Sequence, residues 1–321
     1  MQNIDYTGIL KKSWQITWSN KYLWWFGFFL ALGSFGGGPN WSGSSTKNTQ
    51  SNDEISSKLG EFVANYWQWL ILAAIFLFII ILLIAVLKLI CQAGIIKSGN
   101  DLIKGQASSF KKGFLEGKKY FWKLFFLSFI VSFFMLGVVL ALLSPVIFLA
   151  LIKSYFWAII FGIAALMMIV VLSIVASFVW MYAVYYITLS DLGIKNSLEN
   201  SFQLFKNNFV PSIIFALIFF ALGIIFNIAL FLILIVLGLV FLALGFLMNA
   251  IMSKTGILID AIVGGLVLSV VLFFSQAVFE TFRQISWLLL FREIASGKSE
   301  EKVAVMKTYK PAEKVLDAEG A

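Results

Sequence analysis

Three polar residues near the end of the last long apolar run, Gln276, Glu280 and Arg283, are the first candidates for chemistry. In an α-helix, which turns about 100° per residue, they share a face about 60° wide with Gly265 and Ser269. An ionisable residue in such a run is by default a candidate site that faces a neighbouring helix or a watery cavity. Glu280 and Arg283 are also i, i+3 neighbours, and we favour an ion pair between them over a ligand or ion site.

The rest of the sequence contains no catalytic, cofactor or metal motif. It has no histidine and one cysteine, Cys91, which excludes histidine-based nucleophile activation and an intramolecular disulfide. The P-loop pattern G-x-x-x-x-G-K-[ST] is missing, and the glycines at 36–38 lack the strand and helix of a phosphate-binding loop. We therefore expect a protein that is not an enzyme and that uses no cofactor or metal.

Aromatic and basic residues form a second set of candidates, for contact with a lipid surface. Trp14 and Trp18 are one helical turn apart, on a face that suits the headgroup region of a bilayer. Polybasic segments are attracted to anionic lipid. The lysines that we assign to this contact are Lys111, Lys112, Lys118 and Lys119.

The composition makes lipid the solvent for much of the surface. Of the 321 residues, 61% are hydrophobic and 12% charged, whereas a soluble domain has about 45–50% apolar and about 25% charged residues. A single water-soluble core stops growing near this chain length, so it cannot hold the excess. The net charge of +8 comes from lysines in short segments between apolar runs. We therefore expect contact with anionic lipid and not with nucleic acid.

Five apolar runs reach the roughly 20 residues that a helix needs to cross about 30 Å of hydrocarbon. They cover residues 62–87, 121–152, 155–189, 212–248 and 256–291. A sixth run, 22–38, is shorter and ends in glycines. It could be a signal peptide, but its bulky Trp and Phe residues favour a retained span. The run 212–248 could fold back near Asn227 to give seven spans, and we favour one long helix.

Lysine and arginine positions predict the orientation. With six spans, 20 of the 24 basic residues lie on the side of the two termini and 4 on the other side. The positive-inside rule makes the lysine-rich side cytoplasmic, and a seventh span would place the basic C-terminal residues outside. We predict a multi-pass plasma-membrane protein with both termini in the cytoplasm. Residues 39–60 are expected to form a polar outer loop, and residues 296–321 a disordered cytoplasmic tail.

A small residue followed by an aromatic residue, a polar cluster and a long apolar run recurs three times. The small and aromatic pairs are Ser13-Trp14, Gly113-Phe114 and Ser201-Phe202. We interpret residues 1–295 as one transmembrane domain of three parallel repeat units, 1–95, 96–190 and 191–295. The alternative is that aromatic and basic patches precede spans in any membrane protein. The predicted fold is all-α, a membrane bundle of about six transmembrane helices in three hairpins, each preceded by an amphipathic cytoplasmic helix.

Small and polar residues inside the runs predict how the spans pack. The run 155–189 has a face of small residues that is typical of helix packing, formed by Gly162, Ala165, Ser173, Ala176 and Ser177. Asn227 is expected to form a hydrogen bond to another helix.

The first forty residues resemble a known group. The spacing W-x-x-[ST]-W, formed by Trp14, Thr17 and Trp18, the run LWWFGFF at 23–29 and the glycines at 36–38 carry the resemblance. These features are similar to those of uncharacterised bacterial six-span membrane proteins, relatives of the membrane domain fused to some glycerophosphodiester phosphodiesterases. The catalytic domain of those enzymes is missing from this chain, so the resemblance implies a membrane domain without that hydrolase activity.

Two functions fit these observations. The first is a non-enzymatic membrane protein that organises lipids or partner proteins at the cytoplasmic leaflet. The alternative is a transporter or scramblase-like conduit that uses the polar face of the last span, with Gln276, Glu280 and Arg283 lining a path.

Overall fold

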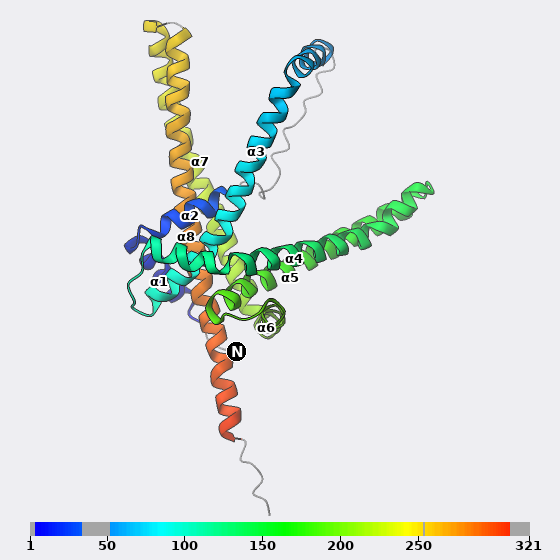
Figure 1. The fold of residues 1–321 in the computed structure, drawn as a ribbon, viewed down its shortest axis with the longest axis vertical. Coiled ribbons are helices and arrows are strands. Elements are labelled where there is room, and N and C mark those ends of the chain that lie inside the picture. Colours follow the sequence, from blue (N-terminus) through cyan, green and yellow to red (C-terminus); the bar gives the residue numbers. More distant parts are fainter. Residues whose placement is uncertain (1–3, 34–51, 253, 309–321) are drawn as a thin grey trace, which may run out of the picture.

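The computed structural model describes residues 4–33, 52–252 and 254–308 (Figure 1). Within these residues the chain forms eight α-helices and no strand, which confirms the all-α prediction. The helices are α1 (Tyr6–Ser19), α2 (Leu23–Leu32), α3 (Asn52–Ile103), α4 (Phe110–Leu151), α5 (Tyr155–Ser190), α6 (Ile194–Asn207), α7 (Phe209–Met252) and α8 (Lys254–Thr308).

Five of the described helices are long and apolar enough to cross a membrane, and each contains one of the five long runs. The crossing segments are Tyr66–Ile103 in α3, Phe110–Leu151 in α4, Tyr155–Ser190 in α5, Phe209–Ala250 in α7 and Thr255–Ser296 in α8. By length and composition these are the helices of a multi-pass membrane protein. The run 212–248 lies in one helix, α7, as predicted. The prediction for Asn227 was wrong, because its side-chain Nδ2 donates to the Gly223 carbonyl of the same helix at 2.7 Å.

The predicted first span, 22–38, is only partly described and is represented by α2. The ten residues of α2 rise about 15 Å, half the thickness of the hydrocarbon core. The helix ends at Leu32, and residues 34–38 lie outside the described residues. Leu23 and Phe26 are fully buried. The described chain thus has five helices that are long and apolar enough to cross a membrane and one short, well-packed apolar helix.

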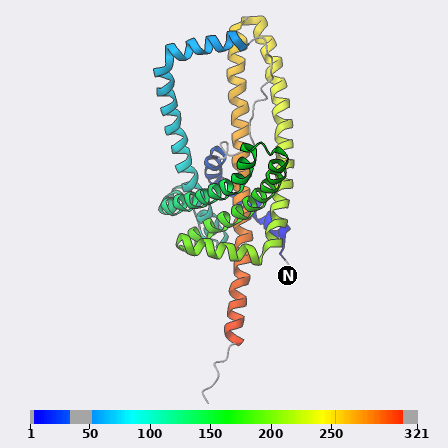
Figure 2. The same cartoon turned by 90° about the vertical axis from the view of Figure 1, so that its right-hand side faces the viewer.

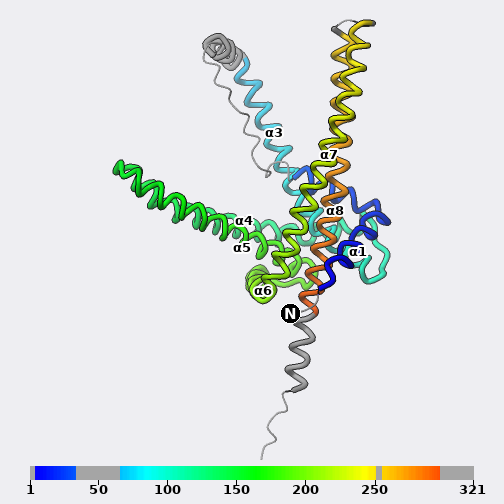
Figure 3. The backbone as a smooth tube through the Cα atoms, turned by 180° about the vertical axis from the view of Figure 1, so that it is seen from behind, coloured from blue at the N-terminus to red at the C-terminus, as the bar shows by residue number. Residues whose placement is uncertain are grey.

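Three arms diverge from a common core. The hairpin of α7 and α8 forms one arm and the hairpin of α4 and α5 the second, while α3 forms the third (Figure 1). Figures 2 and 3 show the same divergence from two other sides. Large apolar side chains are buried where the arms meet, and the outer parts of the arms expose theirs. The core lies at the helix ends that carry most of the lysines, whereas Lys153 sits at the far turn between α4 and α5.

Glycines allow the closest helix contacts of the core. A Cβ atom at Gly117 of α4 would overlap the Ile90 carbonyl oxygen of α3 and would lie 2.9 Å from the Gly94 nitrogen. A Cβ atom at Gly27 of α2 would overlap the Ala277 carbonyl oxygen of α8. Glycine and other small residues let membrane helices approach until their backbones touch. These positions fix α4 on α3 and α2 on α8.

Three boundaries differ from the sequence prediction. α3 begins at Asn52, within the predicted outer loop 39–60, and departs from helical geometry at Tyr66, where φ is −122° and ψ is 15°. α4 is continuous from Phe110, so the basic segment of the middle unit is not a separate helix. Its glycines do not interrupt the helix because they pack against α3.

The third difference lies at the C-terminal end. α8 continues to Thr308, so the first part of the tail predicted to be disordered is helical. Residues 299–308 contain neither glycine nor proline and are rich in Glu, Lys, Ala and Met, which favour helix. The remainder of the predicted tail, 309–321, lies outside the described residues.

Candidate functional site

Glu280 and Arg283 of α8 form the ion pair that their spacing predicts. Arg283 Nη2 donates to Glu280 Oε1 at 2.6 Å, and Gln284 Nε2 donates to the same oxygen at 3.1 Å. The Glu280 side chain is 11% exposed and that of Arg283 44% exposed. A buried carboxylate needs such donors, because an uncompensated charge away from water is costly. Gln276, the third predicted residue, is partly buried on the same helix and does not join this cluster.

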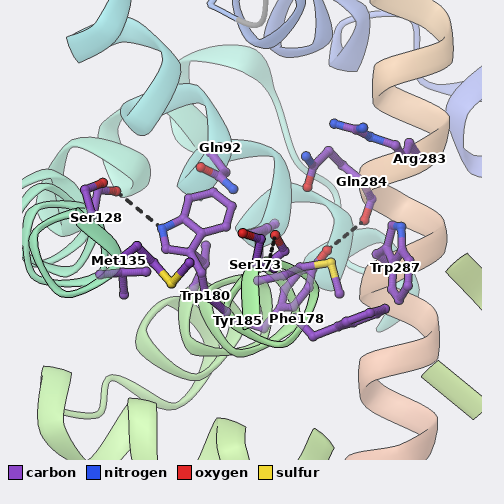
Figure 4. A pocket seen from close by; sticks show the side chains of 17 residues that line it. Gln92, Ser128, Met135, Ser173, Phe178, Trp180, Tyr185, Arg283, Gln284 and Trp287 are labelled. Atoms are coloured by element: carbon purple, nitrogen blue, oxygen red, sulfur yellow. Dashed lines mark hydrogen bonds between the residues drawn. The ribbon is translucent and has the colours of Figure 1, made fainter. Parts of the chain in front are cut away.

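Beside this pair lies a cavity of about 700 Å³ between α3, α4, α5 and α8 (Figure 4). Its lining side chains are apolar and aromatic groups mixed with hydroxyl, amide and guanidinium groups. They are Gln92, Ile96, Ser128, Val131, Ser132, Met135, Ser173, Ala176, Ser177, Phe178, Trp180, Met181, Val184, Tyr185, Arg283, Gln284 and Trp287. Of the predicted polar face, Arg283 lines the cavity, whereas Glu280 and Gln276 do not.

The small face on α5 divides into two parts. Ala165 is buried and a Cβ atom at Gly162 would lie 3.7 Å from Val146 of α4, in line with the expected helix packing. Ser173, Ala176 and Ser177, which were also expected to pack against a helix, line the cavity wall. Ser177 Oγ donates to the Ser173 carbonyl oxygen at 2.7 Å. Across the cavity, Trp180 Nε1 donates to Ser128 Oγ at 3.4 Å. Small side chains on α5 thus leave room for a cavity, where larger ones would fill the space.

Gln92 is the lining residue that sequence reasoning missed. It is only 5% exposed, and its Oε1 has no hydrogen-bond partner within the described residues. An unpartnered buried polar atom costs about 1–3 kcal/mol. An amide next to Cys91, just after the apolar run 62–87, is a visible signal in the sequence. Its significance depends on helices far away in the chain, so the sequence alone does not reveal it.

The two tryptophans assigned to lipid contact lie on α1, at the edge of the core. Trp14 is 49% exposed and Trp18 is 53% exposed. Their rings stack at 5.4 Å, and Trp14 meets Phe282 of α8 edge to face at 5.6 Å. Trp18 contacts Trp24 of α2 at 5.4 Å, and Trp24 Nε1 donates to the Thr17 carbonyl oxygen at 2.9 Å. One side of this aromatic cluster therefore packs against the core, and the other side is exposed at the surface of the protein.

The four predicted lysines divide into two kinds. Lys112 pairs with Asp101 at 2.7 Å, and Lys119 pairs with Glu116 at 3.1 Å. Lys111 and Lys118 are exposed, and neither forms an ion pair within the part of the chain that the structure describes. The uncompensated positive charge of this segment is thus carried by Lys111 and Lys118.

A further ion pair joins the start of α4 to the end of α5. Lys123 Nζ donates to Asp191 Oδ1 at 2.7 Å, and this hydrogen bond holds the pKa of the Asp191 carboxyl below its ordinary value. Asp191 adopts a left-handed conformation, with φ at 53°, where α5 ends. Both groups lie at the surface, so this pair contributes little to stability.

The site offers no metal-binding chemistry in the described part of the chain. No group of three or more His, Cys, Asp or Glu residues there could hold a metal ion. Cys91 is free and fully buried in the core. What the site combines is the Glu280–Arg283 ion pair, an amide with an unpartnered oxygen and a mixed apolar and hydroxyl wall, which suits binding better than covalent chemistry.

Comparison with known proteins adds no relative. No family model, no curated protein and no solved structure matches the chain. The resemblance to the membrane domain of glycerophosphodiester phosphodiesterases therefore stays a prediction. The family of the chain is not assigned, and its function has to be argued from the geometry of its own residues.

Proposed function

We propose that this chain is a non-enzymatic plasma-membrane protein that organises lipids, anionic lipids above all, at the cytoplasmic leaflet. Both termini and the core would lie on the cytoplasmic side, and the three arms would cross the bilayer. The observation that carries this proposal is the edge of the core, where Trp14 and Trp18 are half exposed and Lys111 and Lys118 are unpaired. Aromatic rings and uncompensated lysines are the groups that anchor a protein in an anionic headgroup layer.

The length of the arms supports this placement. The crossing segments of α4 and α8 have 42 residues each and would rise about 63 Å, twice the hydrocarbon thickness. Long helices fit a bilayer by tilting or by extending past the headgroups. If the outer parts of the arms cross the hydrocarbon, the core lies at the cytoplasmic interface and partly below it. Lys111 and Lys118 then reach the headgroups.

The proposal also includes six membrane crossings, two in each of the three repeat units. Ser13, Gly113 and Ser201, the small residues of the repeated pattern, are all buried, and the aromatic residue after each is more exposed. α1 and α6 each bury one face and expose a polar one, as amphipathic helices at a membrane surface do. α2 and the residues that follow it would supply the sixth crossing.

The lysines give the proposal a direct test. Anionic lipid contributes about 1 kcal/mol per surface lysine, so Lys111→Gln with Lys118→Gln should lower a preference for anionic lipid by about 2 kcal/mol, which is more than tenfold. The measurement is the association of spin-labelled phosphatidylglycerol, relative to phosphatidylcholine, with the reconstituted full-length protein.

The matched control is Lys111→Arg with Lys118→Arg, which keeps both charges and should keep the preference. The proposal fails if the wild-type protein does not prefer phosphatidylglycerol. It also fails if the glutamine and arginine variants behave alike.

A conduit is the second candidate, and the cavity beside Arg283 favours it. A lipid headgroup crossing the membrane would need a polar path. The cavity could form part of such a path, because its lining includes four serines, Ser128, Ser132, Ser173 and Ser177. Glu280 is engaged by Arg283 and Gln284 and does not line the cavity, which favours a structural role for this carboxylate. Lipid scrambling or solute flux in proteoliposomes that survives Glu280→Gln would argue against a conduit built on the predicted polar face.

A further inference from the structure

We propose that the cavity between α3, α4, α5 and α8 binds the headgroup of one phospholipid from the cytoplasmic leaflet. The ligand chemistry is a phosphodiester that also carries a hydrogen-bond donor, such as the glycerol or ethanolamine of a lipid headgroup. This inference rests on the proposed membrane placement and deepens it. It adds one defined lipid site inside the protein to the general attraction at the core's edge.

The charge around the cavity favours an anion. Arg283 is the one charged side chain among the described residues that line the cavity, so the charge of the lining is positive. A guanidinium has five N–H donors, and Arg283 uses one of them, to Glu280, within the described residues. Arg283 lines the cavity, so its other donors can bind a phosphate oxygen there, and a guanidinium matches phosphate geometry in two-point hydrogen bonds.

Gln92 defines the second half of the site. Its side chain lines the cavity from α3 (Figure 4), 95% buried and with Oε1 unpartnered. Oε1 accepts and does not donate, so a bare phosphate leaves it unsatisfied, whereas a headgroup hydroxyl or ammonium satisfies it. A ligand with an anionic phosphate and a nearby donor therefore complements Arg283 and Gln92 together.

The walls point to a lipid as the carrier of this headgroup. Apolar side chains, among them Met135, Met181 and Trp287, line the cavity beside the polar groups. Beyond it, α3 and the hairpin of α4 and α5 diverge and expose apolar side chains (Figure 1). A soluble phosphate compound gains nothing from these surfaces, whereas acyl chains would lie along them. A volume of about 700 Å³ is within the range of ligand sites and holds a headgroup with the start of its chains.

The experiment is native mass spectrometry of the purified full-length protein in detergent. The protein is titrated with phosphatidylglycerol, phosphatidylethanolamine and phosphatidylcholine, whose choline group has no N–H or O–H donor. We expect one tightly retained phosphatidylglycerol or phosphatidylethanolamine and at least tenfold weaker retention of phosphatidylcholine. Equal retention of all three lipids overturns the proposal. Displacement of the lipid by millimolar inorganic phosphate or glycerol phosphate also overturns it, because it assigns the site to a soluble anion.

Two variants locate the bound lipid. Gln92→Leu removes the amide, and Ala176→Phe fills the cavity from α5, and each should weaken retention at least tenfold. Gln68→Leu, the same exchange on the exposed outer part of α3, is the matched control and should retain the lipid as the wild type does. Without added lipid, Gln92→Leu should unfold no earlier than the wild type, because it removes an unsatisfied buried atom. Wild-type retention in both cavity variants overturns the assignment.

A third variant separates this inference from the proposed function. Lys111→Gln with Lys118→Gln lies outside the cavity, so it should weaken the general preference for anionic lipid more than tenfold and leave the single retained lipid in place. The opposite outcome is that the lysine variant loses the retained lipid while both cavity variants keep it. In that case the cavity is not the binding site, and the proposed attraction of anionic lipid to the edge of the core still holds.

Discussion

Gly117→Leu should disrupt the contact between α3 and α4 and lower the stability of the protein by about 3 kcal/mol or more. A Cβ atom at this position would overlap the Ile90 carbonyl oxygen and lie 2.9 Å from the Gly94 nitrogen. These are backbone atoms, so the clash cannot be relieved by a change of rotamer, and the two helices must move apart. Cys91, the only cysteine, is fully buried in the same contact region and serves as a reporter. A thiol-reactive fluorophore that detects Cys91 during heating should show an earlier transition.

Gly137→Leu is the matched control, since it places the same side chain on the same helix. Nothing lies within 4 Å of a Cβ atom at Gly137. The added side chain would face lipid, where leucine is well accommodated, so the unfolding transition should not fall. Equal loss of stability in the two variants would contradict the packing of α4 on α3.

The second large effect is expected from Gly27→Ala in α2. Even one methyl group here would overlap the Ala277 carbonyl oxygen and the Thr281 hydroxyl of α8. The Thr281 hydroxyl proton is shared between the Ala277 carbonyl oxygen of α8 at 2.8 Å and the Leu23 carbonyl oxygen of α2 at 3.2 Å, and displacement of α2 would break the contact with Leu23. Loss of the packed contact should cost on the order of 2–3 kcal/mol, because α2 buries much of its surface against α8 and α3.

The control for this variant is Gly265→Ala on α8 itself, where a Cβ atom has nothing within 4 Å. Thermal unfolding followed by Cys91 labelling again provides the measurement. Limited proteolysis adds a second readout, because release of α2 should expose the connection between α1 and α2 near Lys21. If Gly27→Ala and Gly265→Ala both unfold at the same temperature as the wild type, α2 does not pack on α8 as described.

Features that depend on local sequence were predictable. Five apolar runs became five long helices because run length alone decides whether a helix can cross hydrocarbon. The pairing of Glu280 with Arg283 follows from their i, i+3 spacing on one helix. The continuity of α7 followed from the distribution of lysines, which opposed a hairpin at Asn227.

Features that depend on distant contacts were not predictable. The cavity needs side chains from four helices, and serines on α5 that look like packing residues line it only because the helices diverge there. The middle basic segment merges into α4 because Gly113 and Gly117 pack on α3, a contact that no local propensity encodes. The tail was predicted to be disordered because it is polar and has no apolar periodicity, but it is helical up to Thr308. Such a segment can continue a helix that has already begun, because extending a helix is easier than starting one.

We propose a membrane placement in which a cytoplasmic core holds three apolar arms whose far ends reach the other side of the membrane. Cysteine labelling of intact cells with a membrane-impermeant maleimide tests it most directly, with Cys91 replaced by alanine and one cysteine introduced at a time. Lys153→Cys, at the turn between α4 and α5, should react in intact cells, whereas Thr7→Cys and Lys118→Cys should react only after permeabilisation. Reaction of Lys118→Cys in intact cells, or of all three positions from one side, would contradict the account.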